Sequence, residues 1–91
     1  MKIKNILIVY TAPRNKEQKK TLELVKKTLK RHNKNFESSD RNSLKKSQFK
    51  NKELIIAVGG DGTFLRAAQF VDNQLIFGVN SDVKDKEGFF M

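Results

Sequence analysis

The sequence predicts a three-layer α/β domain in which helices cover both faces of a mainly parallel sheet. Short apolar runs at residues 3–9, 53–58 and 75–79 have the length and continuity of strands buried on both faces. Helix-favouring segments separate these runs, and such alternation produces parallel βαβ units with right-handed crossovers. The second run ends in a glycine-rich turn that leads into a helix-like segment, an arrangement by which α/β proteins build phosphate sites: Gly59-Gly60-Asp61-Gly62-Thr63.

The first half of the chain is interpreted as strand, turn, helix and strand. A turn at residues 11–15 follows the first apolar run, and a helix is expected over about residues 16–32. Its inner face would carry an apolar stripe at positions i, i+3 and i+7: Leu22, Val25 and Leu29. Asparagines at 33 and 35 interrupt this pattern, and a short strand is expected near Phe36.

The middle of the chain is the hardest part to interpret. Residues 38–52 are polar and basic, with only Leu44 and Phe49 apolar, so a loop and a short helix packed by these two side chains both fit. A helix from residue 62 or 63 to 71 is expected after the glycine turn. Its inner face would be one of two sets: Leu65, Ala68 and Val71, or Phe64, Ala67, Ala68 and Val71.

Composition limits the class of protein. The chain has 91 residues, 37% of them hydrophobic, which suits one small domain with a modest core. No window approaches the about 18 apolar residues of a membrane span. Residues 1–10 fit a first strand better than a secretory signal. There is no cysteine, which excludes disulfides and thiolate zinc sites. We therefore expect a cytoplasmic protein without a membrane partner.

The net charge of +9 is concentrated in two segments. Residues 14–34 hold nine basic residues against two acidic ones, and residues 41–52 hold five basic residues and no acidic one. Such a field attracts nucleotides, polyphosphates or nucleic acid, although a solvated helix face and a charged loop would carry the same charge. Aromatic residues are absent between Thr11 and Asn35, so a surface for stacking bases is not indicated and nucleic acid is not the expected partner.

The glycine turn is the strongest functional signal. Glycines allow close approach of a ligand to the backbone, and the following helix offers free N–H groups to an anion. A lone carboxylate among them, Asp61, suits proton abstraction or contact with a metal, and the structural alternative is a helix N-cap. If the strands are parallel, the segments 10–11, 59–63 and 80–90 leave strands at their carboxyl ends and converge on one edge of the sheet.

The residues from Gly59 to Ala68 resemble the NAD kinase family, which carries Gly-Gly-Asp-Gly-Thr after a buried strand. Lipid kinases with a similar turn continue with Asn-Glu and Val, and phosphofructokinases have Ser at the fifth position. Ile76-Phe77-Gly78-Val79-Asn80 is similar to the family's strand ending in Gly-Ile/Val-Asn, and Glu87-Gly88-Phe89-Phe90 to its Leu-Gly-Phe segment. Residues 81–86 look like the Asn-Ser/Thr-Asp variant of mitochondrial-type members and depart from the shorter bacterial loop.

The resemblance implies a Rossmann-like lobe over residues 1–80 and a loop over residues 81–91 that leads toward a second, β-rich domain absent from this chain. It implies transfer of a phosphoryl group from ATP or polyphosphate to the 2′-hydroxyl of the adenosine ribose of NAD, which gives NADP. Mg²⁺ would accompany ATP, and the intact protein would be a homo-oligomer. The Asn-Glu/Asp pair of the second domain is missing, so the isolated chain is expected to be inactive or weakly active.

By the same resemblance, Asp61 is the catalytic carboxylate that accepts the hydroxyl proton or holds the hydroxyl and a metal. No spacing of residues indicates a dedicated metal site. The residues expected to bind substrate or nucleotide are Gly59, Gly60, Gly62, Thr63, Asn80 and Phe89, with Leu65 and Arg66 as further candidates. Core packing is the alternative for Leu65, and solvent or a surface ion pair for Arg66. The competing functions are a nucleotide- or nucleic-acid-binding module without catalysis and a lobe of a lipid kinase.

Overall fold

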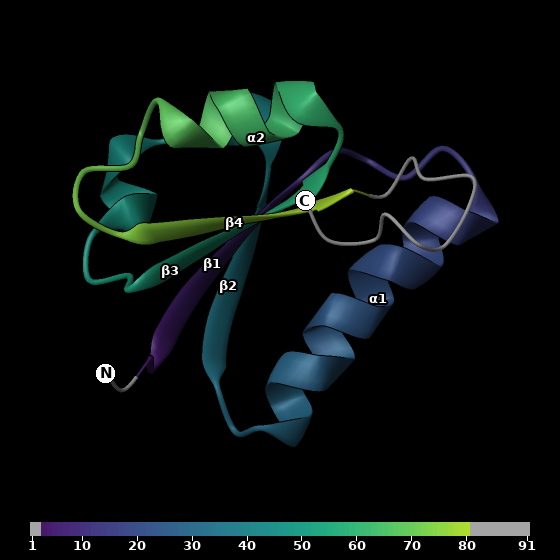
Figure 1. Ribbon diagram of the computed structural model, residues 1–91, viewed down its shortest axis with the longest axis horizontal. Coiled ribbons are helices and arrows are strands. Elements are labelled where there is room, and N and C mark those ends of the chain that lie inside the picture. Colours follow the sequence, from purple (N-terminus) through teal and green to yellow (C-terminus); the bar gives the residue numbers. More distant parts are fainter. Residues whose placement is uncertain (1–2, 81–91) are drawn as a thin grey trace.

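A computed structural model describes residues 3–80 and shows four parallel strands in one sheet with helices on both faces (Figure 1). The order across the sheet is β2-β1-β3-β4. The strands are β1 (Asn5–Tyr10), β2 (Asn35–Asp40), β3 (Leu54–Gly59) and β4 (Leu75–Asn80). The helices are α1 (Lys16–Arg31) and α2 (Asp61–Ala68). The predicted α/β class and the Rossmann-like three-layer architecture are confirmed.

The core is divided by the sheet into two layers. Successive side chains of a strand point to opposite faces, so each central strand contributes to both layers. On the α1 side, Ile6 and Ile8 of β1 pack with residues of β3 and β4. On the α2 side, Leu7 and Val9 pack with β3, α2 and Phe49. The continuous apolar runs of β1 and β3 therefore reflect burial on both faces, as predicted.

The expected boundaries of α1 are reproduced closely. Asn15 is the N-cap, and its side chain accepts a hydrogen bond of 2.9 Å from the N–H of Gln18. Leu22 is buried, while Val25 and Leu29 pack partly buried against the same core layer, so the predicted stripe is confirmed. After the helix, Asn33 has a φ of 56°, a left-handed conformation that asparagine tolerates, and β2 follows where a strand was expected.

The polar segment that follows β2 folds into two short 3₁₀ helices, η1 (Arg41–Ser43) and η2 (Lys46–Phe49), on the α2 side of the sheet. Phe49 is its main anchor: the side chain is buried and stacks on Phe70, with ring centroids 5.3 Å apart. Leu44 packs partly buried against the same layer. Of the two alternatives for this segment, short helical turns packed by Leu44 and Phe49 describe it better.

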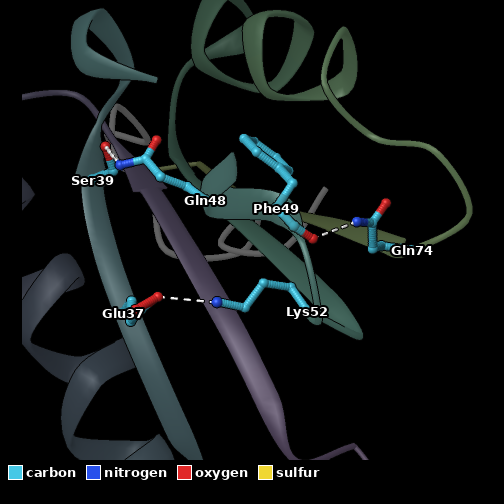
Figure 2. A network of polar contacts seen from close by, with 6 residues as sticks. All are labelled: Glu37, Ser39, Gln48, Phe49, Lys52 and Gln74. Atoms are coloured by element: carbon cyan, nitrogen blue, oxygen red, sulfur yellow. Dashed lines mark hydrogen bonds and ion pairs between the residues drawn. The ribbon is translucent and has the colours of Figure 1, made fainter. Parts of the chain in front are cut away.

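Polar contacts complete this anchoring (Figure 2). The Gln48 side chain donates a hydrogen bond of 3.1 Å to the Ser39 hydroxyl of β2. On the other side, Gln74 donates one of 2.7 Å to the carbonyl oxygen of Phe49. Lys52 forms an ion pair of 3.0 Å with Glu37. Gln48 and Lys52 thus connect the segment to β2, and Phe49 between them connects it to the loop before β4.

The second helix and last strand differ from the expectation in detail. α2 begins at residue 61 and ends at 68, whereas a span from 62 or 63 to 71 was predicted. Ala67 is buried and Phe64 packs against the core, while Leu65 is 62% exposed, so the set containing Phe64 is correct and core packing of Leu65 is wrong. No helix within residues 3–80 is long and apolar enough to cross a membrane.

The expectation that the last apolar run is buried on both faces is also wrong. β4 is an edge strand, and its Leu75 and Phe77 are 49% and 41% exposed. Both residues lie on the same face of the sheet as Val79, which belongs to the α1-side layer. The main contacts of α1 are with β2 and β3, so α1 leaves this part of β4 uncovered.

Candidate functional site

The carboxyl ends of the strands surround a cavity of about 280 Å³, as the parallel topology predicts. The loops after β1, β2 and β3 all contribute to it. Its lining consists of Thr11, Arg14, Gln18, Arg41, Gly59, Gly60, Asp61 and Gly62. Three of the predicted glycines and the predicted carboxylate are therefore brought together at one site.

Gly59 ends β3 in a conformation that only glycine adopts easily, with a φ of 156°. A Cβ atom on this residue would lie 2.5 Å from the hydroxyl oxygen of Thr63 and 2.9 Å from that of Thr11. These two hydroxyls form a short hydrogen bond directly behind the turn. Close packing behind the turn therefore requires glycine here, in addition to any approach of a ligand from the cavity.

Thr63 supports the turn from inside the protein. It is fully buried, and its hydroxyl is hydrogen-bonded to Thr11, so in this structure it does not line the cavity. Thr11 is partly buried and does line it, and its N–H donates to the carbonyl oxygen of Val58 at 3.2 Å. The two threonines thus join the ends of β1 and β3 beneath the glycine turn.

Asp61 occupies the first position of α2 and is exposed at the cavity. Gly60 is the N-cap, with extended backbone angles of −92° and −168°, so the N-cap interpretation of Asp61 is wrong. Within residues 3–80, the Asp61 carboxylate has no hydrogen bond or ion pair. The N–H groups of Thr63 and Phe64 bond to the Gly60 carbonyl oxygen, whereas first-turn N–H groups before them have no acceptor within the helix.

Two arginines at the site were missed by sequence reasoning. Arg14 follows β1, and Arg41 follows β2 in η1. The Nη1 atom of Arg41 lies 3.1 Å from the position that a Cβ of Gly62 would occupy. The rule that ligands bind beyond the carboxyl ends of parallel strands could have drawn attention to both, since each lies in a loop that leaves such an end.

Arg66 has a different role from the expected alternatives. Its Nε donates a hydrogen bond of 2.9 Å to the carbonyl oxygen of Arg41, so its side chain connects α2 to η1. It forms no ion pair with a residue of the described range. Neither Arg66 nor Leu65 lines the cavity.

The remaining predicted residues lie as follows. Asn80 is the last residue of β4 and pairs in register with Gly59, which places it beside the turn. Phe89 lies outside the described residues, as does the whole predicted loop at residues 81–91. Between residues 3 and 80, no group of three or more His, Cys, Asp or Glu side chains could hold a metal ion.

One pKa shift lies at the amino ends of the strands, away from the cavity, and has a structural cause. The pKa of Glu53 is lowered because its Oε1 accepts hydrogen bonds from the N–H groups of Lys4 and Asn5, at 2.9 and 3.1 Å. This carboxylate joins the amino ends of β1 and β3. It is not one of the residues that line the cavity.

The chain is similar to known proteins over most of its length. A family model described as the ATP-NAD kinase N-terminal domain matches residues 3–84. The chain is also similar to a "Probable NADH kinase" of Oryza sativa subsp. japonica, with 38% identity over 74 residues. That alignment covers 80% of this chain and 22% of the relative, so the chain spans about a fifth of the length of the curated relative it matches.

Proposed function

Because the chain belongs to the NAD kinase family, we propose that it forms the nucleotide-binding lobe of an enzyme that makes NADP. The reaction is transfer of a phosphoryl group from ATP or inorganic polyphosphate to the 2′-hydroxyl of the adenosine ribose of NAD. The observation that carries this proposal is the position of Asp61. This residue is exposed at the cavity beside the glycine turn, and its carboxylate is unpaired within the described residues.

Asp61 would act on the acceptor hydroxyl. As the ribose oxygen attacks the terminal phosphorus of the donor, the hydroxyl proton passes to the carboxylate, and the bond from phosphorus to the leaving oxygen breaks. Since phosphoryl transfer depends mainly on positioning and on charge stabilisation, the backbone N–H groups at Gly60 and Gly62 would hold phosphate oxygens. These roles use the turn as it stands, without movement of the sheet.

Mg²⁺ fits this site as an ion that arrives with the nucleotide. The ion needs few protein ligands when phosphates supply the others, and Asp61 is the carboxylate among the described cavity residues. When bound, Mg²⁺ would neutralise charge on the transferred group.

The rest of the substrate site would come from a second domain. The alignment covers 22% of the rice relative, and the name of that relative makes NADH a candidate acceptor beside NAD. We therefore expect the 91-residue chain alone to form little or no NADP. Assembly into a homo-oligomer and a cytoplasmic location stay predictions for the intact protein.

The test is an assay of NADP formation by the product of the complete reading frame that contains these residues. Asp61→Asn should lower kcat about 10²–10⁴-fold, the usual contribution of a general base. Asp72→Asn is the matched control, because it removes the same charge from an exposed residue after the other end of α2. Unchanged turnover in Asp61→Asn would refute the assigned role. NADP formation by the 91-residue chain at ordinary kinase rates, ~1–100 per second, would refute the need for a second domain.

The net charge of +9 favours one alternative, a module that binds nucleic acid without catalysis. Such binding would weaken steeply with salt and would not change in Gly62→Val. A nucleotide site at the cavity predicts the opposite, because a valine side chain would meet the Arg41 guanidinium and fill space beside the turn. Titrations with ATP and with an oligonucleotide at two salt concentrations separate the two functions.

A further inference from the structure

The cavity carries two cations that the glycine motif does not include. Arg14 and Arg41 line it from different loops, after β1 and after β2, and the Nη1 atom of Arg41 lies beside Gly62. Within the described part of the chain, neither side chain has a hydrogen bond or an ion pair. Asp61 lies in the same lining, yet neither arginine approaches it within the 4.0 Å of an ion pair.

Arg41 is held in place although its loop contains only short 3₁₀ turns. The Asp40 side chain accepts a hydrogen bond of 2.8 Å from the N–H of Asn42 and fixes the start of η1. Arg66 then fixes η1 against α2 through its bond to the Arg41 carbonyl oxygen. Further along, the buried Phe49 anchors the loop to the core. These contacts fix the backbone of Arg41, from which its side chain extends to Gly62.

The charges of the site favour a ligand with several anionic oxygens. Two guanidinium groups and one carboxylate leave the lining with a net positive charge, and the first turn of α2 adds N–H groups and the positive end of the helix dipole. Guanidinium binds phosphate in a bidentate manner, and two arginines on separate loops can contact successive phosphates. A volume of about 280 Å³ suits a phosphate chain rather than a whole dinucleotide.

We propose that Arg14 and Arg41 bind the phosphate chain of the phosphoryl donor, and that Arg66 is a positioning residue that acts through Arg41. This inference rests on the proposed function, which assigns no role to either cavity arginine. The ligand class is a chain of phosphates, whether in a nucleoside triphosphate or in inorganic polyphosphate.

Calorimetric titration of the 91-residue chain with ATP, inorganic tripolyphosphate and adenosine tests the two cavity arginines. Arg41→Gln and Arg14→Gln should each weaken binding of ATP roughly tenfold to a hundredfold, as expected for loss of a charge-assisted pair. Binding of adenosine should not change. Arg31→Gln is the control: it removes the same charge from an exposed residue in the last turn of α1 and should not change the affinity for ATP. Equal losses in all three variants would reduce the effect to net charge and overturn the proposal.

The two phosphate ligands separate the possible sources of the chain. If Arg41→Gln weakens the binding of tripolyphosphate and of ATP equally, the site recognises only the phosphate groups and accepts either donor. If only ATP loses affinity, the arginines serve a nucleoside triphosphate. Unchanged affinity for both ligands in a folded variant would overturn the assignment. Both arginine side chains are unpaired within residues 3–80, so circular dichroism should show unaltered folding.

A double-mutant cycle tests the positioning role of Arg66. Arg66→Gln should weaken ATP binding in the wild-type background, because η1 loses its tie to α2. It should have no further effect in the Arg41→Gln background, since the residue acts through Arg41. Additive losses would mean that Arg66 contacts the ligand itself and would overturn the positioning role.

The proposal and the proposed function can fail separately. If the arginine variants lose phosphate binding but the complete enzyme forms no NADP, the proposed phosphate site is supported and the proposed kinase function is refuted. A complete enzyme that forms NADP and depends on Asp61, but keeps its KM for ATP in Arg14→Gln and Arg41→Gln, would keep the kinase and reject the arginine site.

Discussion

Replacement of Gly59 by alanine should destabilise the domain by about 2–6 kcal/mol. A non-glycine residue at its φ of 156° carries backbone strain of about 1–3 kcal/mol. The added methyl group would also lie 2.5 Å from the Thr63 hydroxyl oxygen and 3.0 Å from Thr63 Cβ, and overpacking of a close-packed site costs about 1–3 kcal/mol. Thr63 is fully buried, so it has little room to yield.

Urea unfolding followed by circular dichroism measures this loss. For a domain of this size, a loss of 2 kcal/mol lowers Tm by roughly 8–16 °C. Gly60→Ala is the matched control, because Gly60 has a φ of −92° that any residue adopts, and it should cost about 1 kcal/mol or less, as loss of a glycine N-cap. A Gly59→Ala variant within about 0.5 kcal/mol of wild type, the range of neutral surface substitutions, would refute the reasoning.

The two contributions can be separated with a second background. Thr63→Ala removes the hydroxyl oxygen that lies nearest the added methyl group. In that background, Gly59→Ala should lose part of its overpacking cost, because the contacts at 2.9 Å with Thr11 Oγ1 and at 3.0 Å with the Cβ of residue 63 remain, and it should keep the strain at φ. The two substitutions should therefore be coupled by about 0.5–2 kcal/mol. Strict additivity would show that steric contact with Thr63 is not the cause.

Two further predictions concern the support of the sheet. Phe49→Ala should cost about 3–5 kcal/mol in urea unfolding, because the side chain is 2% exposed and stacks on Phe70; a loss below about 1 kcal/mol would show that η2 is not anchored by it. Glu53 has a lowered pKa in the folded state, so its stabilisation is complete above the ordinary glutamate pKa and is lost as pH falls through the lowered value. Wild type should therefore lose more stability than Glu53→Gln on acidification, and parallel pH profiles would contradict this.

The hydrophobic pattern within a segment was sufficient to predict which residues of α1, β1 and β3 are buried. The stripe of α1 and the continuous apolar runs of β1 and β3 lie as predicted. The position of β4 at the edge could not be predicted from its own residues, because the order of strands depends on the crossover connections and on pairing with strands elsewhere in the chain. Its run of apolar residues is similar to that of β3, yet Leu75 and Phe77 are partly exposed.

The candidate site was predicted in part for the same reason. The turn from Gly59 to Gly62 is a local motif, so its residues could be identified along with the carboxylate between them. Arg41 could not be identified this way, because its position depends on Arg66, 25 residues further along the chain, and on the burial of Phe49. Long-range contacts of this kind leave no periodic trace in a segment that is polar and basic throughout.

The one-residue difference between the first helical position and the N-cap decides what Asp61 can do. An aspartate at the N-cap accepts a hydrogen bond from a backbone N–H of the first turn, which occupies its carboxylate and turns it toward the helix. In this chain, Gly60 takes that position, and Asp61 is left at the cavity, unpaired within the described residues. Gly60 has extended backbone angles and follows Gly59, which packs closely against the hydrogen-bonded hydroxyls of Thr11 and Thr63. The packing of those residues, rather than the carboxylate alone, therefore makes a base available beside the phosphate-binding backbone.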